Sequence, residues 1–226
     1  SRIKLDWKHH KDKMDNIAES DPYGTAISMR WMESFLAGIG FDLSRQKSNL
    51  IGENGQSYPI SHVAENLDSL PVHITGFTTR DRAENKNTLD IKSREGASKF
   101  SPQGMVQEYL NVTEHVYGIA TNGYFLRLIR DSGRLVKMAY IELNIKKLLD
   151  EDKYSEFNVL YRLIHASRFP KSRNETQQSI LETYYRESIE TGNRIREELS
   201  DAVKKSLLAL GNGFLQHPAN EKLRLR

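Results

Sequence analysis

The sequence predicts an α/β protein in which helices flank a mixed β-sheet and one long helix follows. Short runs rich in β-branched and aromatic residues, bounded by turn residues, recur between residues 57 and 143 and are typical of strands. Stripes of apolar residues at helical spacing stand before, between and after these runs. A hydrophobic content of 38% beside 28% charged residues is enough to build a globular core.

The first helix that the pattern predicts begins near Asp21. Asp21 is a good N-cap residue, and Pro22 suits the first helical position because its missing N–H would be unpaired there anyway. Gly38 and Gly40 predict the end of the helix. Its apolar stripe consists of Ile27, Trp31, Phe35 and Ile39.

A polar stretch from residue 44 to residue 57 follows, and Asn54-Gly55 within it indicates a loop or a hairpin tip. Residues 57–61 and 70–77 then read as strands, and the second contains the β-branched Val72, Ile74 and Thr75. Residues 78–101 are almost all polar and predict an irregular segment.

Ser101-Pro102 predicts the start of a helix that contains Gln107 and Tyr109. The turn Thr121-Asn122-Gly123 lies between the apolar runs 117–120 and 124–130, and Asn-Gly between two apolar runs predicts a tight β-turn. A further strand is expected over residues 135–143, after a second turn at residues 131–133.

Two helices complete the chain. Residues 154–169 form the first, which Pro170 ends. From Asn174 onward, apolar and small residues recur at alternating spacings of three and four and predict one long helix that ends at Gly211-Asn212-Gly213. We therefore expect an α/β domain over residues 1–170 and a helical connector over residues 171–226.

Several motifs of the chain resemble the N-terminal region of large restriction-modification polypeptides. The motifs are VQEYLN, GIATNG, LRLIRDS, YIEL and HASRFP between residues 106 and 170, YPISH and PVHITGF before them, and LGNGFLQHPAN after them. The family comprises the type II (IIG-like) restriction enzyme methylase subunits, including the adenine-N6 DNA methylases of DISARM-type phage defence. The resemblance covers nearly the whole chain.

The resemblance implies a DNA methyltransferase whose catalytic domain lies downstream of this chain. No Asn/Asp-Pro-Pro-Tyr/Phe motif and no Gly-rich cofactor loop occurs in the 226 residues. We therefore expect the chain to be the N-terminal part of a longer protein that uses S-adenosylmethionine elsewhere, and no cofactor in this part. Double-stranded DNA, the downstream methyltransferase domain and other subunits of a defence system are the expected partners.

The order helix, strands, helix, strand, strand is compatible with a restriction-endonuclease-like core, here in degenerate form. Active nucleases of this kind hold Mg²⁺ with an Asp and an Asp/Glu-x-Lys group on adjacent strands, and the metal acidifies a water molecule. Asp90-Ile91-Lys92 matches that spacing, with Asp68 or Asp81 as the first carboxylate. Gln107 lies on the helix that follows, where such folds often place a polar residue.

Two observations favour a scaffold without metal over an active nuclease. The residues around Asp90 and Lys92 are those of a loop rather than of the rigid strand that catalysis needs. The strand that reads as central carries His73 and Thr75 where an acid and a lysine would be required.

Basic residues are concentrated between residues 127 and 173, where eleven Lys and Arg residues stand against six Asp and Glu residues. The whole chain has a formal net charge of only +3, so this segment carries the basic excess. Since phosphate contacts dominate affinity for DNA, such a segment suits a duplex, although a solvated surface has the same composition. The candidate DNA-binding residues are Arg127, Arg130, Arg134, Arg168, Lys171 and Arg173.

Other classes of site and location are disfavoured. No run approaches the roughly 18 apolar residues that a membrane-spanning helix needs, and no secretory signal is evident, so we expect a cytoplasmic protein without membrane contact. The absence of cysteine excludes disulfides and thiolate metal sites. The histidines form no i,i+4 pair that would indicate zinc.

Three functions remain open. The first, which we favour, is a DNA-engaging scaffold domain of an adenine methyltransferase, itself without catalysis. The second is a Mg²⁺-dependent endonuclease module of a fused restriction-methylase enzyme, with Asp90 as metal ligand and Lys92 as its catalytic partner. The third is a protein–protein docking domain of a defence complex, with the long helix as its contact surface.

Overall fold

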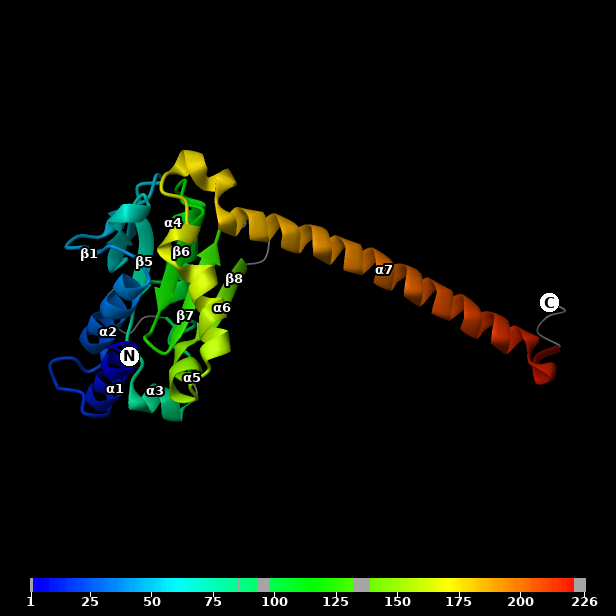
Figure 1. Cartoon of the computed structure of the whole chain (residues 1–226), viewed down its shortest axis with the longest axis horizontal. Coiled ribbons are helices and arrows are strands. Elements are labelled where there is room, and N and C mark those ends of the chain that lie inside the picture. Colours follow the sequence, from blue (N-terminus) through cyan, green and yellow to red (C-terminus); the bar gives the residue numbers. More distant parts are fainter. Residues whose placement is uncertain (1, 85, 93–97, 132–138, 222–226) are drawn as a thin grey trace. The chain divides into compact units, whose positions relative to one another are not determined.

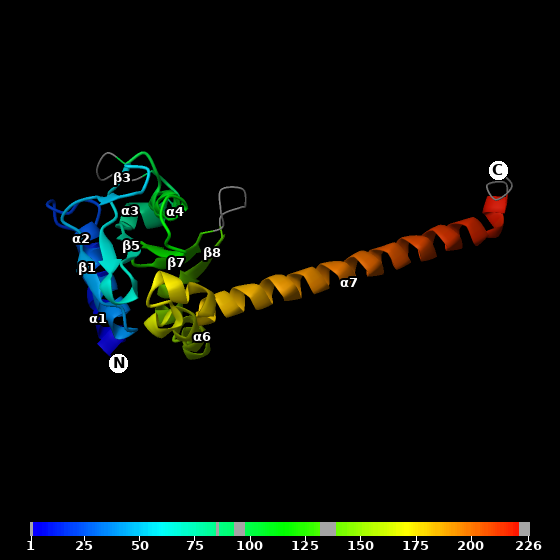
Figure 2. The ribbon, with the colours of Figure 1, turned by 90° about the horizontal axis from the view of Figure 1, so that it is seen from above.

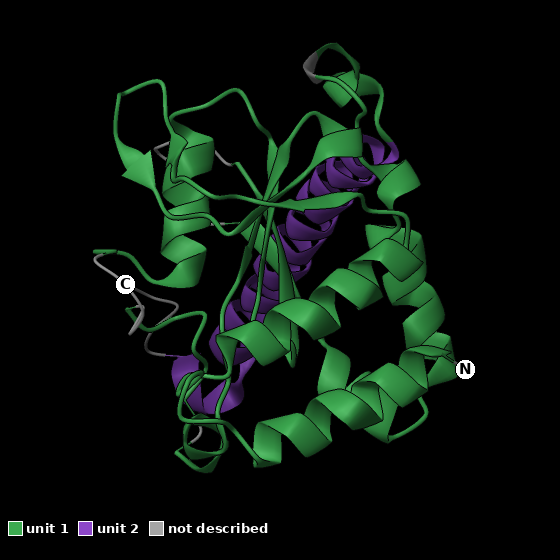
Figure 3. Ribbon diagram, turned by 90° about the vertical axis from the view of Figure 1, so that its left-hand side faces the viewer, with its two compact units in different colours: residues 1–179 green, residues 180–226 purple. Residues whose placement is uncertain are grey.

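The computed structural model describes residues 2–84, 86–92, 98–131 and 139–221 (Figure 1). The chain forms two compact units, Ser1–Ser179 and Ile180–Arg226 (Figure 3). The first unit thus extends beyond Pro170, and its Thr176 and Ser179 are buried. Ile180–Arg226 is therefore shorter than the connector that we expected.

A six-stranded sheet forms the centre of the first unit, in the order β1-β4-β5-β6-β7-β8. β5 and β6 are parallel, and all other neighbours in this sheet are antiparallel. The prediction of a mixed α/β fold is thus confirmed. The strands are β1 (Leu43–Arg45), β4 (His62–Ala64), β5 (Leu70–Ile74), β6 (Tyr117–Thr121), β7 (Phe125–Arg130) and β8 (Ala139–Asn144).

The register of the strands assigns side chains to the two faces of the sheet. Residues that pair across neighbouring strands point to the same face. His73, Ala120, Arg127 and Glu142 form one such row across β5 to β8. Helix α4 (Pro102–Asn111) lies on this face, because its Gln103 contacts Arg127.

Helix α2 (Thr25–Gly38) covers the opposite face. His62, Val72, Ile119 and Leu128 form the row that points there, and His62 Nε2 lies 2.9 Å from Glu33 Oε1 of α2. Helices therefore lie on both faces of the sheet, α4 on one and α2 on the other (Figure 2). Along the chain the elements follow in the order α2, β1, β4, β5, α4, β6.

The α4 layer packs closely because β6 has a glycine beneath it. A Cβ atom on Gly118 would lie 2.6 Å from Val106 Cγ1, which is too close for any real side chain. The small residues of β6 thus let α4 approach the sheet. The core beneath α4 consists of Leu89, Val106, Leu110, Ala120 and Ile129.

Helix α1 (Arg2–Asp15) packs against α2, and the sequence pattern did not predict it. Trp7, His10 and Trp31 join Tyr124 in an aromatic cluster, with ring centroids 5.3 to 5.8 Å apart. Trp31 Nε1 also donates to the carbonyl of Gly123 at 2.9 Å. This cluster attaches α1 to the turn between β6 and β7.

The predicted start of α2 is corrected by three residues. Gly24, with φ of 69°, is the N-cap, and α2 begins at Thr25 rather than at Pro22. Asp21 nevertheless contacts the first turn of α2, because its Oδ2 accepts a hydrogen bond from the backbone N–H of Ile27 at 3.2 Å. The predicted end at Gly38 is confirmed.

The remaining elements of the first unit connect these layers. Helix α6 ends five residues before the expected Phe169, because His165 leaves the helical conformation and Ala166 N donates to Ile39 O at 2.9 Å. The predicted hairpin tip near Asn54-Gly55 lies between β2 and β3. The elements are β2 (Leu50–Ile51), β3 (Ser57–Tyr58), η1 (Glu65–Leu67), α3 (Thr79–Ala83), α5 (Ile145–Asp150), α6 (Tyr154–Ile164), η2 (Ala166–Arg168) and η3 (Arg173–Gln178).

The second unit is dominated by α7 (Ile180–Gln216), a single helix of 37 residues that η4 (Pro218–Asn220) follows. The predicted long helix is confirmed, but its predicted end at Gly211-Asn212-Gly213 is wrong because the helix continues through these residues. None of the helices in the described ranges is both long and apolar enough to cross a membrane.

Two histidines in the first unit predict a loss of stability in acid. Burial, aided by Arg82, lowers the pKa of His10 to about 4, and burial, aided by His62, lowers that of His73 to about 4. The unfolded chain therefore takes up protons between pH 6.5 and 4 that the folded chain refuses, so stability falls as the pH falls through this window. Each histidine contributes up to about 3 kcal/mol to this loss.

Urea unfolding at pH 7 and pH 4.5 measures the effect. We expect His10→Phe, which removes one titrating ring and keeps an aromatic one, to show a shallower dependence on pH than the wild type. His9→Phe is the matched control, because His9 is exposed and should leave the dependence unchanged. Equal pH dependence in wild type and His10→Phe would contradict the assignment to His10.

Candidate functional site around Arg127

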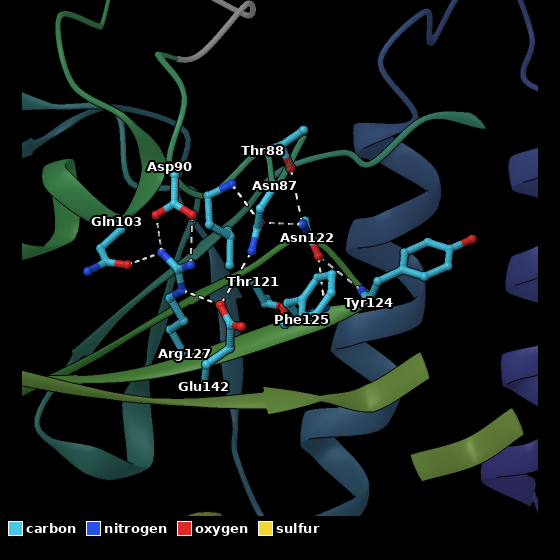
Figure 4. A network of polar contacts seen from close by, with 11 residues as sticks. Asn87, Thr88, Asp90, Gln103, Thr121, Asn122, Tyr124, Phe125, Arg127 and Glu142 are labelled. Atoms are coloured by element: carbon cyan, nitrogen blue, oxygen red, sulfur yellow. Dashed lines mark hydrogen bonds and ion pairs between the residues drawn. The ribbon is translucent and has the colours of Figure 1, made fainter. Parts of the chain in front are cut away.

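Arg127, in the middle of β7, lies at the centre of the best-connected polar cluster on the α4 face (Figure 4). The residue is 3% exposed. Its Nε donates to Glu142 Oε2 at 2.7 Å and its Nη2 to Asp90 Oδ2 at 2.8 Å. Its Nη1 donates to the carboxylate of Asp90 and to the side-chain oxygen of Gln103. The Tyr140 ring lies 4.7 Å from the guanidinium carbon, within reach of a cation–π contact.

The partners of Arg127 keep its guanidinium charged. Burial opposes the charge on Arg127, but hydrogen bonds and charge from Asp90 and Glu142 outweigh it, and the pKa of Arg127 rises above its ordinary value. One buried cation thus stands against two carboxylates and an amide oxygen. We define Arg127, Asp90, Glu142 and Gln103 as the Arg127 cluster.

The segment that carries Asp90 is held by Asn122, in the turn between β6 and β7. Asn122 is fully buried. Its Oδ1 accepts hydrogen bonds from the backbone N–H groups of Tyr124, at 3.1 Å, and Phe125, at 2.8 Å. Its Nδ2 donates to Asn87 Oδ1 and to Thr88 Oγ1, both at 3.2 Å. The asparagine of the GIATNG motif thus fixes its own turn and a segment 34 to 35 residues away.

Further bonds make the connection continuous. Asn87 Nδ2 donates to Glu142 Oε2 at 3.3 Å, which joins the turn to the Arg127 cluster. Thr121 Oγ1 donates to Phe125 O at 2.8 Å and accepts from Gly123 N at 3.1 Å. Gly123 has a φ of 84°, which other residues rarely adopt, so the motif requires glycine there.

The residues of the nuclease prediction do not come together as an open metal site. Asp90 lies in a turn, not in a strand, and its carboxylate is engaged by Arg127. Asp81 Oδ2 accepts from the N–H and hydroxyl of Thr78 in the capping box of α3. Asp68 follows η1, and Lys92 is exposed. Within the described ranges, no group of three or more His, Asp or Glu side chains could hold a metal ion.

The donor set therefore does not fit the Mg²⁺ that the nuclease alternative requires. Asp90 and Glu142 do converge, but they converge on the guanidinium of Arg127. The neighbouring strands β4 and β5 hold no carboxylate in their sequences HVA and LPVHI. Gln107 lies on α4 as expected, and its Nε2 donates to Asn111 Oδ1 of the same helix at 3.1 Å. Gln103, one turn earlier, is the glutamine that reaches the cluster.

The predicted DNA-binding residues are only partly available. The expectation that Arg127 contacts phosphate is corrected, because its guanidinium is buried and paired with carboxylates. Arg130 is half-buried and donates to Asp131 O at 2.7 Å. Arg168 is half-buried as well, and Lys171 is exposed. Arg134 and the side chain of Arg173 lie outside the described residues.

Sequence reasoning missed Glu142 and Gln103 as members of the cluster. Glu142 is an acidic residue on a strand that the sequence predicted to pair with β7. Recognising it as the partner of Arg127 requires the register of these two strands. Gln103 is in the first turn of a predicted helix, where Ser101 Oγ accepts from Gly104 N at 3.1 Å. Nothing in its spacing distinguishes it from Gln107.

Comparison with known proteins adds no relative. No protein-family model, no curated protein and no solved structure matches the chain.

Replacing Arg127 should destabilise the first unit, since Asp90 and Glu142 would then lie close together without a counter-charge. We expect Arg127→Met, which keeps the volume of the alkyl stem, to lower the free energy of unfolding by about 3 kcal/mol. Arg127→Lys keeps the charge but loses the forked donors, so its loss should be smaller. Chemical denaturation measures both variants.

Arg80→Ala is the matched control, because Arg80 also pairs with a carboxylate but is exposed. This variant should unfold at the wild-type denaturant concentration. An Arg127→Met protein as stable as the wild type would show that the cluster contributes nothing to the fold.

Replacing Asn122 should release the segment that carries Asp90. Asn122→Ala leaves two buried backbone N–H groups without acceptors, and we expect a loss of about 3 kcal/mol. Asn122→Asp keeps the acceptors and loses the donors to Asn87 and Thr88, so it should free residues 86–92 with a smaller loss of stability. Hydrogen exchange should then show faster exchange in residues 86–92, and unchanged protection there would contradict the role of Asn122.

Proposed function

We propose that the chain is a DNA-engaging, non-catalytic scaffold domain of a restriction-modification or phage-defence adenine methyltransferase that acts in the cytoplasm. Methyl transfer from S-adenosylmethionine would belong to a downstream domain of the same polypeptide. The family part of the proposal is based on the motif resemblance described above. The order α2, β1, β4, β5, α4, β6, with β5 parallel to β6, supports a restriction-endonuclease-like core in degenerate form.

The observation that carries the non-catalytic part is the pairing of Asp90 with Arg127. Asp90 is the carboxylate of the D-x-K sequence considered above, and it accepts hydrogen bonds from a buried guanidinium. A guanidinium is a permanent cation, so it takes the place that a divalent metal would need between Asp90 and Glu142. This arrangement supports a core that has kept the nuclease topology without the metal.

DNA engagement is supported by the basic residues that stay accessible. Lys171 is exposed, and Arg130 and Arg168 are partly exposed. Arg134 and Arg173 remain candidates from the sequence. Since such residues would contact phosphates rather than bases, binding should depend on ionic strength and not on sequence.

The protein–protein docking alternative has one observation in its favour. Apolar residues along α7 are exposed, including Ile195 at 56%, Leu199 at 63% and Leu207 at 63%. A helix with such a face commonly packs against another surface. Docking by α7 is compatible with a scaffold that engages DNA through its first unit.

The proposal predicts duplex binding without cleavage. We expect a fluorescein-labelled duplex to bind the whole chain, with the logarithm of affinity falling against that of salt concentration at a slope of about −3 if three phosphates are contacted. Lys171→Glu should weaken binding and reduce the slope by about one. Absence of duplex binding at low salt would refute DNA engagement.

The same protein should leave supercoiled plasmid intact in the presence of Mg²⁺. Plasmid nicking that Asp90→Asn abolishes would instead establish the endonuclease alternative. Arg80→Ala alters an exposed ion pair outside the Arg127 cluster. Purified in the same way, it is the control for nuclease that contaminates the protein preparation.

A further inference from the structure

A groove between α1 and α2 has the features of an anion site. Its volume is about 210 Å³, and residues of both helices line it. Arg2, His9 and Lys13 line it from α1, and Arg30 lines it from α2. Asp6 is its one acidic lining residue.

The charges of the groove are incompletely neutralised. Asp6 Oδ2 accepts from Ser34 Oγ at 2.8 Å and lies 4.0 Å from Arg2 Nε, so its charge is already engaged. Lys13 and Arg30 are exposed, and the described part of the chain supplies neither side chain with a hydrogen bond or ion pair. Two free cations therefore face one hollow from opposite helices.

The buried side of the groove presents a second, independent feature. His10 also lines it and is only 3% exposed, and within the described residues neither ring nitrogen makes a hydrogen bond of good geometry, the backbone of Ile27 being its polar neighbour. The ring packs against Trp7 and against Trp31, at centroid distances of 5.4 and 5.8 Å, and these contacts restrict its orientation. A buried ring nitrogen without a partner is unfavourable, which indicates a polar occupant of the groove.

We propose that the α1–α2 groove binds phosphate groups of the DNA backbone. This inference is based on the proposed DNA-engaging function and adds the contact site to it. Arg30 offers a planar fork of donors that matches phosphate oxygens, and Lys13 offers a point charge on a flexible stem. An imidazole N–H of His10 can donate to the same group. Such contacts position a duplex and read no sequence.

A basic solvated surface would share the exposed cations but not the other two features. It would need neither a hollow between facing cations nor a buried histidine without partners. A divalent cation is a poor occupant, since the groove has one carboxylate against three Lys and Arg side chains.

The test compares two double variants of the whole chain. Lys13→Ala/Arg30→Ala removes the two free cations of the groove, and Lys8→Ala/Lys147→Ala removes two exposed cations that do not line it. Anisotropy titrations with a short labelled duplex at two ionic strengths give affinity and salt slope. We expect the groove variant to bind about tenfold more weakly and with a slope reduced by about two, whereas the control keeps the wild-type slope.

The outcomes separate the groove from the function. If the wild type binds duplex and the two variants lose affinity equally, the groove is not the contact site and DNA engagement stands. If the wild type does not bind, both the groove and the proposed function fail. Thermal unfolding of each variant checks that it is folded. His10→Phe removes the ring nitrogens and leaves both cations. It should therefore lower the affinity for duplex and leave the salt slope nearly unchanged.

Discussion

A buried guanidinium must be neutralised where it lies, and this requirement at Arg127 organises the α4 face of the sheet. Removing such a charge from water costs several kcal/mol unless partners surround it. Glu142 supplies one carboxylate from the neighbouring strand, Asp90 supplies another from a segment far away in the sequence, and Gln103 adds an oxygen from α4. One side chain therefore ties β8, the loop before residue 92 and α4 to the middle of β7.

The same requirement explains why residues that resemble a functional motif have structural partners. Asp90-Ile91-Lys92 has the spacing of a metal site, and Arg127 lies in a basic segment, yet the two residues pair with each other. The bonds of Asn122 extend this connection to the turn between β6 and β7. Thus the GIATNG motif is accounted for by folding alone: its asparagine satisfies two backbone donors, and its glycine has a positive φ.

The elements that depend on local chemistry could be predicted from sequence. The Asn-Gly turn with its two strands and the Ser-Pro start of α4 are examples, because cap and turn residues act on their own neighbours. Helix α1 was missed because its buried residues Trp7, His10 and Met14 stand among many charged ones. In the site, Asp90 was identified but its partner was not. Arg127 faces Glu142 only in the observed register of β7 and β8, and the turn signals of the sequence did not determine that register.

The two faces of the sheet consequently differ in what they can do. On the α4 face the guanidinium of Arg127 is paired with two carboxylates, and His73, in the same row, is uncharged at neutral pH because burial lowers its pKa to about 4. Within the described residues, the Arg127 cluster therefore presents neither an unpaired cation to a phosphate nor a group of carboxylates that could hold a metal ion. Attraction for a polyanion must come from cations without carboxylate partners. In the first unit such cations belong to the helical layer and the connecting segments, where Lys13, Arg30 and Lys171 are exposed. If the first unit binds DNA as we propose, the covering helices would hold the duplex and the central strands would not.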